Sequence, residues 1–174
     1  FAAMTFDNVD YVTVRNISFE STDPSAAAAA LFRNANHNTL SNCQLIVDAS
    51  STLSAVSNTV MSSSNSSLST GAVANYNTIS NNKMKGGYYG FYMYGSTSQL
   101  LVNNKIMNNE LDSVYYYGVY SYYNDSLEVV GNDIDQTQRS NVNGDGAYIY
   151  YSNNVVFEGN NILAEDYGAY FYNF

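Results

Sequence analysis

The sequence contains no tryptophan, one cysteine and one proline among its 174 residues. Cys43 has no partner for a disulfide or a cysteine metal cluster, so we expect a small buried thiol. Because Pro24 is the one residue that cannot donate to a strand ladder, long stretches of the chain remain suited to strands. Apolar runs fall far short of the roughly 20 residues of a membrane span, which argues against membrane insertion.

Positive charge is also scarce. Six Lys and Arg residues face fifteen Asp and Glu residues, which gives a net charge of −9. Nucleic acids and anionic membranes require clustered cations, so neither is an expected partner, and polyanions such as polyuronates should be repelled. The single histidine, His37, falls at a predicted turn and is interpreted as a solvated residue rather than a catalytic one.

Tyrosine, in contrast, is abundant, with 18 residues. Four segments share the pattern Gly-X-Tyr-X-Tyr, at 90–94, 118–122, 146–150 and 168–172, and their glycines lie 28, 28 and 22 residues apart. Such a repeat indicates stacked coils. Strand alternation then places both tyrosines of each segment on one face and the intervening residues on the other, packed face.

The outward face is the main candidate binding site. Its predicted members are Tyr92, Tyr94, Tyr120, Tyr122, Tyr148, Tyr150, Tyr170 and Tyr172. The variable turns add Tyr88, Tyr89, Tyr115, Tyr116, Tyr117 and Tyr167. An exposed aromatic patch of this extent usually marks a binding surface, and flat rings with a polar tip suit sugars or protein partners. The alternative is that the rings only stabilise the sheet as cross-strand pairs.

A second signature accompanies the first: an apolar residue, any residue, Asn or Gly, a turn residue, any residue and another apolar residue. It occurs at 14–19, 40–45, 79–84, 101–106, 129–134 and 157–162. Two core columns follow, the first being Val14, Leu40, Ile79, Leu101, Val129 and Phe157, and the second Phe19, Leu45, Met84, Ile106, Ile134 and Ile162. The turn asparagines Asn82, Asn104, Asn132 and Asn160 are predicted to form a hydrogen-bonded ladder.

Six rungs are therefore predicted in a single domain over residues 1–174. The 39-residue spacing from Leu45 to Met84 is too short for two coils, so we expect an inserted polar loop at about 50–70, within which 62–70 is rich in Ser, Thr and Asn. The register places 28–33 in a strand, although the alanines there suit a helix. Because the sequence begins and ends within predicted strands, we expect an excerpt of a longer solenoid.

These motifs resemble the right-handed parallel β-helix repeat of the pectate-lyase-like superfamily, including its adhesin and surface-protein members. The resemblance implies an all-β solenoid of about six coils of 22–28 residues, one with the inserted loop. It also implies that the glycine-led strands form the sheet whose outer face lines the substrate groove in the related enzymes. The architecture itself carries several functions.

Enzymatic activity is the alternative function. Related lyases use acidic calcium ligands with Arg or Lys, and related hydrolases use several aspartates, but the outward strand positions of the tyrosine coils contain none of these. Asp145 with Asp166 is a weak candidate for a catalytic carboxylate pair. Asn143 with Asp145 is a weak candidate for calcium binding, and an ordinary solvated turn is favoured over both.

The sequence thus predicts a non-catalytic structural or adhesive solenoid of a secreted or cell-surface protein, without a cofactor unless calcium binds. Its tyrosine face is expected to bind a glycan or a partner protein, and the molecule to self-associate end to end or laterally. The alternative prediction is a polysaccharide lyase or glycoside hydrolase.

Overall fold

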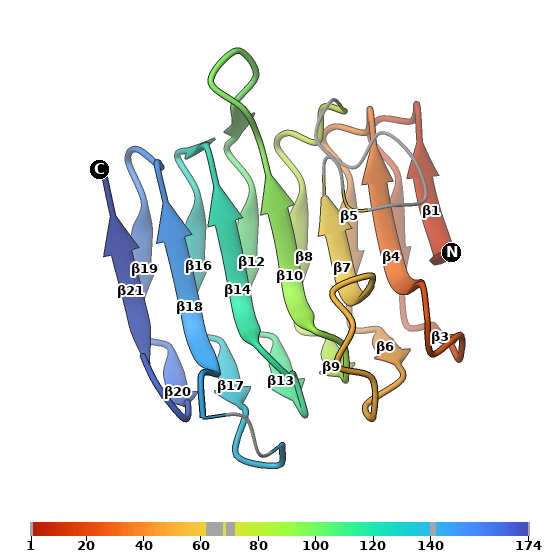
Figure 1. The fold of residues 1–174 in the computed structure, drawn as a ribbon. Helices are drawn as coiled ribbons and strands as arrows, with labels where there is room; N and C mark the ends of the chain where they lie inside the picture. Colours follow the sequence, from red (N-terminus) through yellow and green to blue (C-terminus); the bar gives the residue numbers. More distant parts are fainter. Residues whose placement is uncertain (1, 62–67, 69–71, 140–141, 174) are drawn as a thin grey trace.

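The computed structural model describes residues 2–61, 68, 72–139 and 142–173. This part of the chain consists of strands and turns, without a helix, and therefore without one long and apolar enough to cross a membrane. The backbone winds as a solenoid with three parallel sheets that run along its length (Figure 1). The prediction of a three-sided parallel β-helix is confirmed.

The first sheet contains seven strands among the described residues, in chain order and all parallel (Figure 1). They are β1 (Ala2–Asp7), β4 (Ala27–Arg33), β7 (Val56–Met61), β10 (Tyr89–Tyr94), β14 (Tyr117–Tyr122), β18 (Asp145–Tyr150) and β21 (Ala169–Tyr172). The alanine-rich segment is thus a strand, as the register predicted. All six residues from Ala27 to Phe32 are buried, so tertiary packing outweighs helix propensity there.

The other two sheets each contain six described strands and form the remaining sides of the solenoid. The second sheet comprises β2 (Thr13–Arg15), β5 (Thr39–Ser41), β8 (Thr78–Ser80), β12 (Lys105–Met107), β16 (Glu128–Val130) and β19 (Val156–Glu158). The third comprises β3 (Ser18–Ser21), β6 (Gln44–Val47), β9 (Lys83–Lys85), β13 (Glu110–Asp112), β17 (Asp133–Asp135) and β20 (Asn161–Leu163). A short pair, β11 (Leu101–Val102) and β15 (Asn124–Asp125), follows strands of the first sheet.

The predicted core columns are wrong in one coil. Ile106, and not Leu101, aligns with Ile79 and Val129 in the second sheet. Leu111, and not Ile106, aligns with Met84 and Ile134 in the third. Leu101 pairs with Asn124 instead, although it too is buried.

The cause is a pair of loop-length differences that cancel. The segment 95–104 between β10 and β12 is five residues longer than the corresponding segment 123–127, and a bridge between Ser96 and Gln99 closes its hairpin-like turn. The turn 113–116 is five residues shorter than the turn 136–144. Both coils therefore keep the 28-residue spacing while their second and third strands are displaced.

The predicted insertion also needs correction. Residues 56–61 lie within the expected loop at about 50–70, yet they form β7, the strand between β4 and β10. This strand was missed because it lacks the glycine and tyrosines of the later coils. Most of the Ser-rich segment lies outside the described residues. Of that segment Leu68 is described, and it packs against the outward cluster that contains Leu31 and Val60.

The asparagine ladder at the turn between the second and third sheets consists of Asn82, Asn109, Asn132 and Asn160. Each Oδ1 accepts a hydrogen bond from the backbone N–H of the preceding rung, at 2.9 to 3.0 Å, and each Nδ2 donates to a backbone carbonyl oxygen of that rung. Asn104 does not belong to it. This residue lies in a second ladder with Asn38 and Asn77, at the turn before the second sheet.

Candidate functional site

A glycine lies next to the first residue of each tyrosine-bearing strand, and at Gly90, Gly118 and Gly146 neighbouring rungs approach each other closely. A Cβ atom at Gly118 would lie 2.4 Å from the carbonyl oxygen of Gly146 and 2.7 Å from a methyl carbon of Ile134. A Cβ atom at Gly90 would lie 2.5 Å from the Gly118 oxygen. These distances leave no space for a side chain, so the glycine repeat fixes the vertical stacking of the strands that follow it.

Alternation along each strand then separates core from surface. In β10, Phe91 and Met93 are fully buried in the core, whereas Tyr92 and Tyr94 belong to or pack against a separate outward cluster. The neighbouring strands repeat this arrangement in register, with Tyr120 opposite Tyr92. We call the outer side of β10, β14, β18 and β21 the tyrosine face.

Two columns of stacked rings form the centre of the tyrosine face. The first column is Tyr92, Tyr120, Tyr148 and Tyr170, and the second is Tyr94, Tyr122, Tyr150 and Tyr172. Successive ring centroids lie 5.7, 6.0 and 5.0 Å apart in the first column, with interplanar angles of 14° to 15°. In the second column they lie 4.6, 5.1 and 4.7 Å apart, at 7° to 20°.

This stacking decides which part of each ring is presented outward. The near-parallel rings of one column turn their faces toward the next rung, and rings in the same strand are also nearly parallel, as for Tyr120 and Tyr122 at 3°. Ring faces are therefore used within the protein, and ring edges remain for contact with a ligand.

Further tyrosines extend the face on both sides. Tyr89 and Tyr117, predicted in turns, instead begin β10 and β14 and stack on each other at 5.7 Å. Tyr123 and Tyr151, which the sequence analysis missed, stack at 5.0 Å just beyond β14 and β18. Their signal was present in the sequence, since they lie 28 residues apart and each follows the second tyrosine of a repeat.

Exposure differs between the start of the face and its centre. Tyr92 is 7% exposed and lies in a cluster with Leu31 and Val60, the residues that precede it in its column. Tyr120 and Tyr148, in the following strands of the same column, are half-buried. The face thus adjoins an apolar, covered region over β4 and β7.

The first coils lack this aromatic surface. At the column position of Tyr94, β1 and β4 carry Asp7 and Arg33, which form an ion pair through two hydrogen bonds. The Arg33 guanidinium group holds the pKa of the Asp7 carboxyl group below its usual value. The two charged groups thus bind each other within the protein.

Several phenol groups of the face have raised pKa values. Burial raises the pKa of Tyr89 to about 12 and also raises the pKa values of Tyr92 and Tyr120 above the ordinary value near 10. For Tyr150 the largest cause of its raised pKa is a hydrogen bond with Tyr151. Beside these phenol groups, the described outward register contains a single carboxylate.

That carboxylate belongs to Asp145, the weak catalytic and calcium candidate. It follows Tyr117 in the outward register, is 5% exposed, and its Oδ1 accepts a hydrogen bond from the Tyr167 N–H at 3.1 Å. Burial, with a smaller contribution from the negative charge of Asp166, raises its pKa. The side chain of Asp145 is thus used in joining two rungs.

The geometry gives little support to the two weak site predictions, the carboxylate pair Asp145 and Asp166 and the calcium candidates Asn143 and Asp145. The backbone N–H of Asp166 donates to the Gly144 carbonyl oxygen, which closes the turn around Asp145, and Asn143 is exposed. Within the described ranges, no three or more His, Cys, Asp or Glu side chains are grouped so that they could hold a metal ion. Calcium binding and carboxylate catalysis remain predictions.

A separate aromatic stack lies on the first coils. His37 is exposed at a turn, as predicted, and its ring stacks between Tyr11 and Tyr76 with centroids 4.8 and 4.6 Å away. All three residues have positive φ, between 56° and 61°. This column of three rings is a matched reference for exposed aromatic surface outside the tyrosine face.

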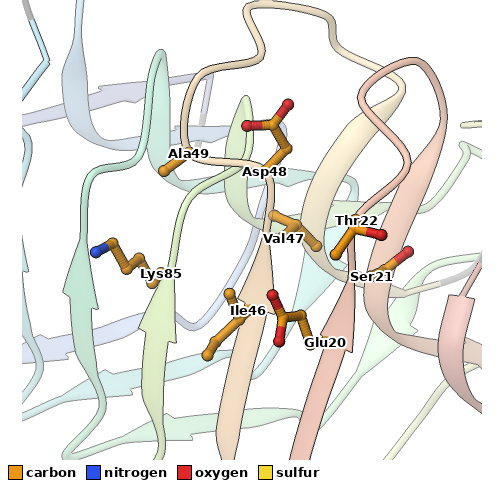
Figure 2. Close-up of a pocket in the computed structure, with 8 residues that line it drawn as sticks. All are labelled: Glu20, Ser21, Thr22, Ile46, Val47, Asp48, Ala49 and Lys85. Carbon is orange, nitrogen blue, oxygen red and sulfur yellow. The ribbon is translucent and has the colours of Figure 1, made fainter.

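A hollow of about 430 Å³ lies away from the tyrosine face. It is formed by the ends of β3 and β6 together with Lys85 of β9 (Figure 2). Glu20 and Asp48 stand on one side of it and the Lys85 ammonium group points away (Figure 2). Asp48 is engaged by the hydroxyl and the N–H of Ser50. The lining changes from rung to rung, unlike the tyrosine face.

The fold and its repeats agree with a comparison of the chain with protein families. A family model described as the right-handed beta helix region matches residues 45–174, about three quarters of the chain. The chain belongs to the right-handed β-helix family. No curated protein and no solved structure gives a match.

The family match covers every strand of this right-handed β-helix that carries the tyrosine face, from β10 to β21. It also includes the full first asparagine ladder, Asn82 to Asn160. The match defines the architecture, and the arrangement of side chains on that architecture has to supply the function.

Proposed function

We propose that this right-handed β-helix is a non-catalytic binding and adhesive module whose tyrosine face binds a neutral glycan along the solenoid axis. The observation that carries the proposal is the pair of regular columns with ring centroids 4.6 to 6.0 Å apart. Identical groups at near-constant spacing suit a ligand that is itself a repeating polymer. A protein partner would present a different surface at every rung.

The chemistry of the surface supports a glycan without acidic groups. Tyrosine hydroxyl groups both donate and accept hydrogen bonds, as sugar hydroxyl groups do. The net charge of −9 disfavours polyuronates and sulfated chains. Stacked tyrosines have few rotamers and are held by their neighbours, so binding costs little side-chain entropy.

The enzyme alternative finds less support at this face. Asp145 is the one acidic side chain in the described outward register of β10, β14, β18 and β21, and it is buried between Tyr117 and Tyr167. A second carboxylate at catalytic distance would be needed for glycosidic bond cleavage. An adhesive role also fits action outside the cell, as we propose.

The proposal is tested with neutral polysaccharides in affinity electrophoresis and pull-down with insoluble glycans. The double variant Tyr120→Phe, Tyr148→Phe keeps the ring stacks but removes two hydroxyl groups, and we expect at least a tenfold loss of affinity. The variant Tyr120→Ala, Tyr148→Ala should lose binding altogether. Tyr11→Phe, Tyr76→Phe is the matched control, since it removes two exposed hydroxyl groups outside the face.

Two experimental outcomes would contradict the proposed function. Binding that persists in both double variants at the face would remove the proposed role of the tyrosines. Release of new sugar ends by wild type, with loss of that release in Asp145→Ala, would instead establish the lyase or hydrolase alternative.

A further inference from the structure

The tyrosines form one continuous network. Of the 18 tyrosines in the sequence, the 16 from Tyr88 to Tyr172 are all linked, with each ring centroid 4.3 to 6.5 Å from that of a neighbour. The network spans four rungs. A phenoxyl radical formed on any of these rings thus has at least one further phenol as a direct neighbour.

We propose that the tyrosine face is a site of oxidative cross-linking, at which a one-electron oxidant joins tyrosines of neighbouring rungs through dityrosine bonds. The expected oxidant class is a haem peroxidase with hydrogen peroxide. This inference goes beyond glycan binding and does not depend on it.

The coupling of two tyrosines is a two-electron oxidation. Two phenols each lose one electron and one proton, and the ring carbons next to the two C–O carbons form a new C–C bond. Each joined carbon then loses its hydrogen to the oxygen of its own ring, which restores both phenols. In total the protein loses two hydrogen atoms, and one hydrogen peroxide molecule is reduced to two water molecules.

The geometry favours bonds between particular rungs. Tyr94 and Tyr122 stack at 4.6 Å and 20°, and Tyr150 and Tyr172 stack at 4.7 Å and 11°. Rings held at this separation react as an intramolecular pair, so coupling should outpace collision with a second molecule. Tyr94, Tyr122 and Tyr150 are partly exposed, which gives an oxidant access to the network along the second column.

Competing oxidation sites are limited. The chain has no tryptophan, and its single thiol, Cys43, is 2% exposed in the core on the other side of the first sheet. Among the outward side chains of β10, β14, β18 and β21, tyrosine is therefore the residue that a one-electron oxidant meets first. Hydrogen bonds between the phenol groups of Tyr122 and Tyr123 and of Tyr150 and Tyr151 extend the contacts beyond the columns.

The test uses the intact chain at low concentration with peroxidase and hydrogen peroxide. Dityrosine fluorescence should appear while the protein remains monomeric on denaturing gels, with a mass loss of two hydrogen atoms per bond. Trypsin cuts after Lys85, Lys105 and Arg139, so a bond between Tyr94 and Tyr122 joins peptide 86–105 to peptide 106–139. Fragmentation of the joined peptide identifies the two tyrosines.

Variants make the result specific. Tyr94→Phe keeps the packing and should abolish the joined species that contains Tyr122 and residue 94, whereas Tyr11→Phe should leave the yield unchanged. The proposal is overturned if modification falls on Tyr11 and Tyr76 alone, if cross-linking yields only dimers that increase with protein concentration, or if peptides gain oxygen without being joined.

Discussion

The first asparagine ladder and the tyrosine face both repeat one residue type from rung to rung, yet they use the repeat differently. The side chains of Asn82, Asn109 and Asn132 are about 1% exposed, and both ends of each amide are bonded within the protein. The tyrosines of the two columns stack through their faces on the outer side of the sheet. Repetition inside satisfies buried polar groups, whereas repetition outside makes a regular surface.

The largest effect that separates these two regions is expected from Asn132→Ala. This change removes the acceptor for the Asn109 N–H and Nδ2 groups and the donor to the Ile106 carbonyl oxygen, all at 2.9 to 3.0 Å. Buried groups left without partners should lower the free energy of unfolding by about 2 to 5 kcal/mol. Urea unfolding followed by circular dichroism measures the loss.

The control variant changes the neighbouring residue, Asn161. Its exposed side chain donates a hydrogen bond to Asp133 in the preceding rung, so Asn161→Ala should change the free energy of unfolding by less than about 0.5 kcal/mol. Equal stability losses in the two variants would contradict the structural role of the ladder. Glycan affinity of folded Asn132→Ala should equal that of wild type.

The next effect in order of size is expected at high pH, where the stability contributed by the buried tyrosines should fall. Burial raises the pKa values of Tyr89, Tyr92 and Tyr120 above the value near 10 that the unfolded chain has. The unfolded state therefore loses its phenol protons first, and stability that is fully present below about pH 10 falls as pH rises through the folded pKa values. Thermal unfolding across this range, with absorbance of the ionised phenol, follows both processes.

Tyr92→Phe is the informative comparison, because it removes one of these titrating groups and keeps the ring. Its stability should decline less steeply above pH 10 than that of wild type. Identical slopes for the two proteins would mean that burial of this hydroxyl does not contribute to the alkaline loss.

The first sheet was readable from sequence because each of its later strands carries its own marker. Glycine fixes the start of the strand and two tyrosines fix its outward side, so Tyr92, Tyr120 and Tyr148 were aligned correctly. The strand β7 has Asn58 where the glycine would be and no tyrosine, and it was mistaken for part of a loop. Because β7 lacks this marker, only the structure reveals it, as the strand that pairs with β4 on one side and with β10 on the other.

The second and third sheets were less predictable because their signature is short and repeats within a coil. Residues 106–111 fit the pattern as well as 101–106 do, and a constant offset from the glycine selected the wrong one. Backbone pairing, which depends on loop lengths on both sides, decides between them.

A smaller effect is expected from Asp145→Asn. Because its folded pKa is raised, the ionised carboxylate lowers stability at pH values above its titration and has no effect where both states are protonated. Asparagine keeps the acceptor for the Tyr167 N–H, so the variant should be more stable than wild type by less than about 1 kcal/mol at neutral pH. The difference should disappear near about pH 3.

Asp166→Asn serves as the control, because Asp166 is exposed and contributes less to this effect. If Asp145→Asn is less stable than wild type at neutral pH, the carboxylate has a favourable partner, and a cation site at this turn becomes the better explanation.

The smallest predicted effect lies where the asparagine ladder ends. Cys43 occupies the ladder position of its rung: its N–H donates to Asn82 Oδ1, but its thiol reaches only the Ser41 carbonyl oxygen. In Cys43→Asn, the new amide would donate to the Val14 carbonyl oxygen, as Asn82 does to Leu40, and raise the free energy of unfolding by less than about 1 kcal/mol. Cys43→Ser has a hydroxyl too short for this contact, and it should be less stable than Cys43→Asn in thermal unfolding. The reverse order would show that the ladder stabilises only rungs with asparagine on both sides.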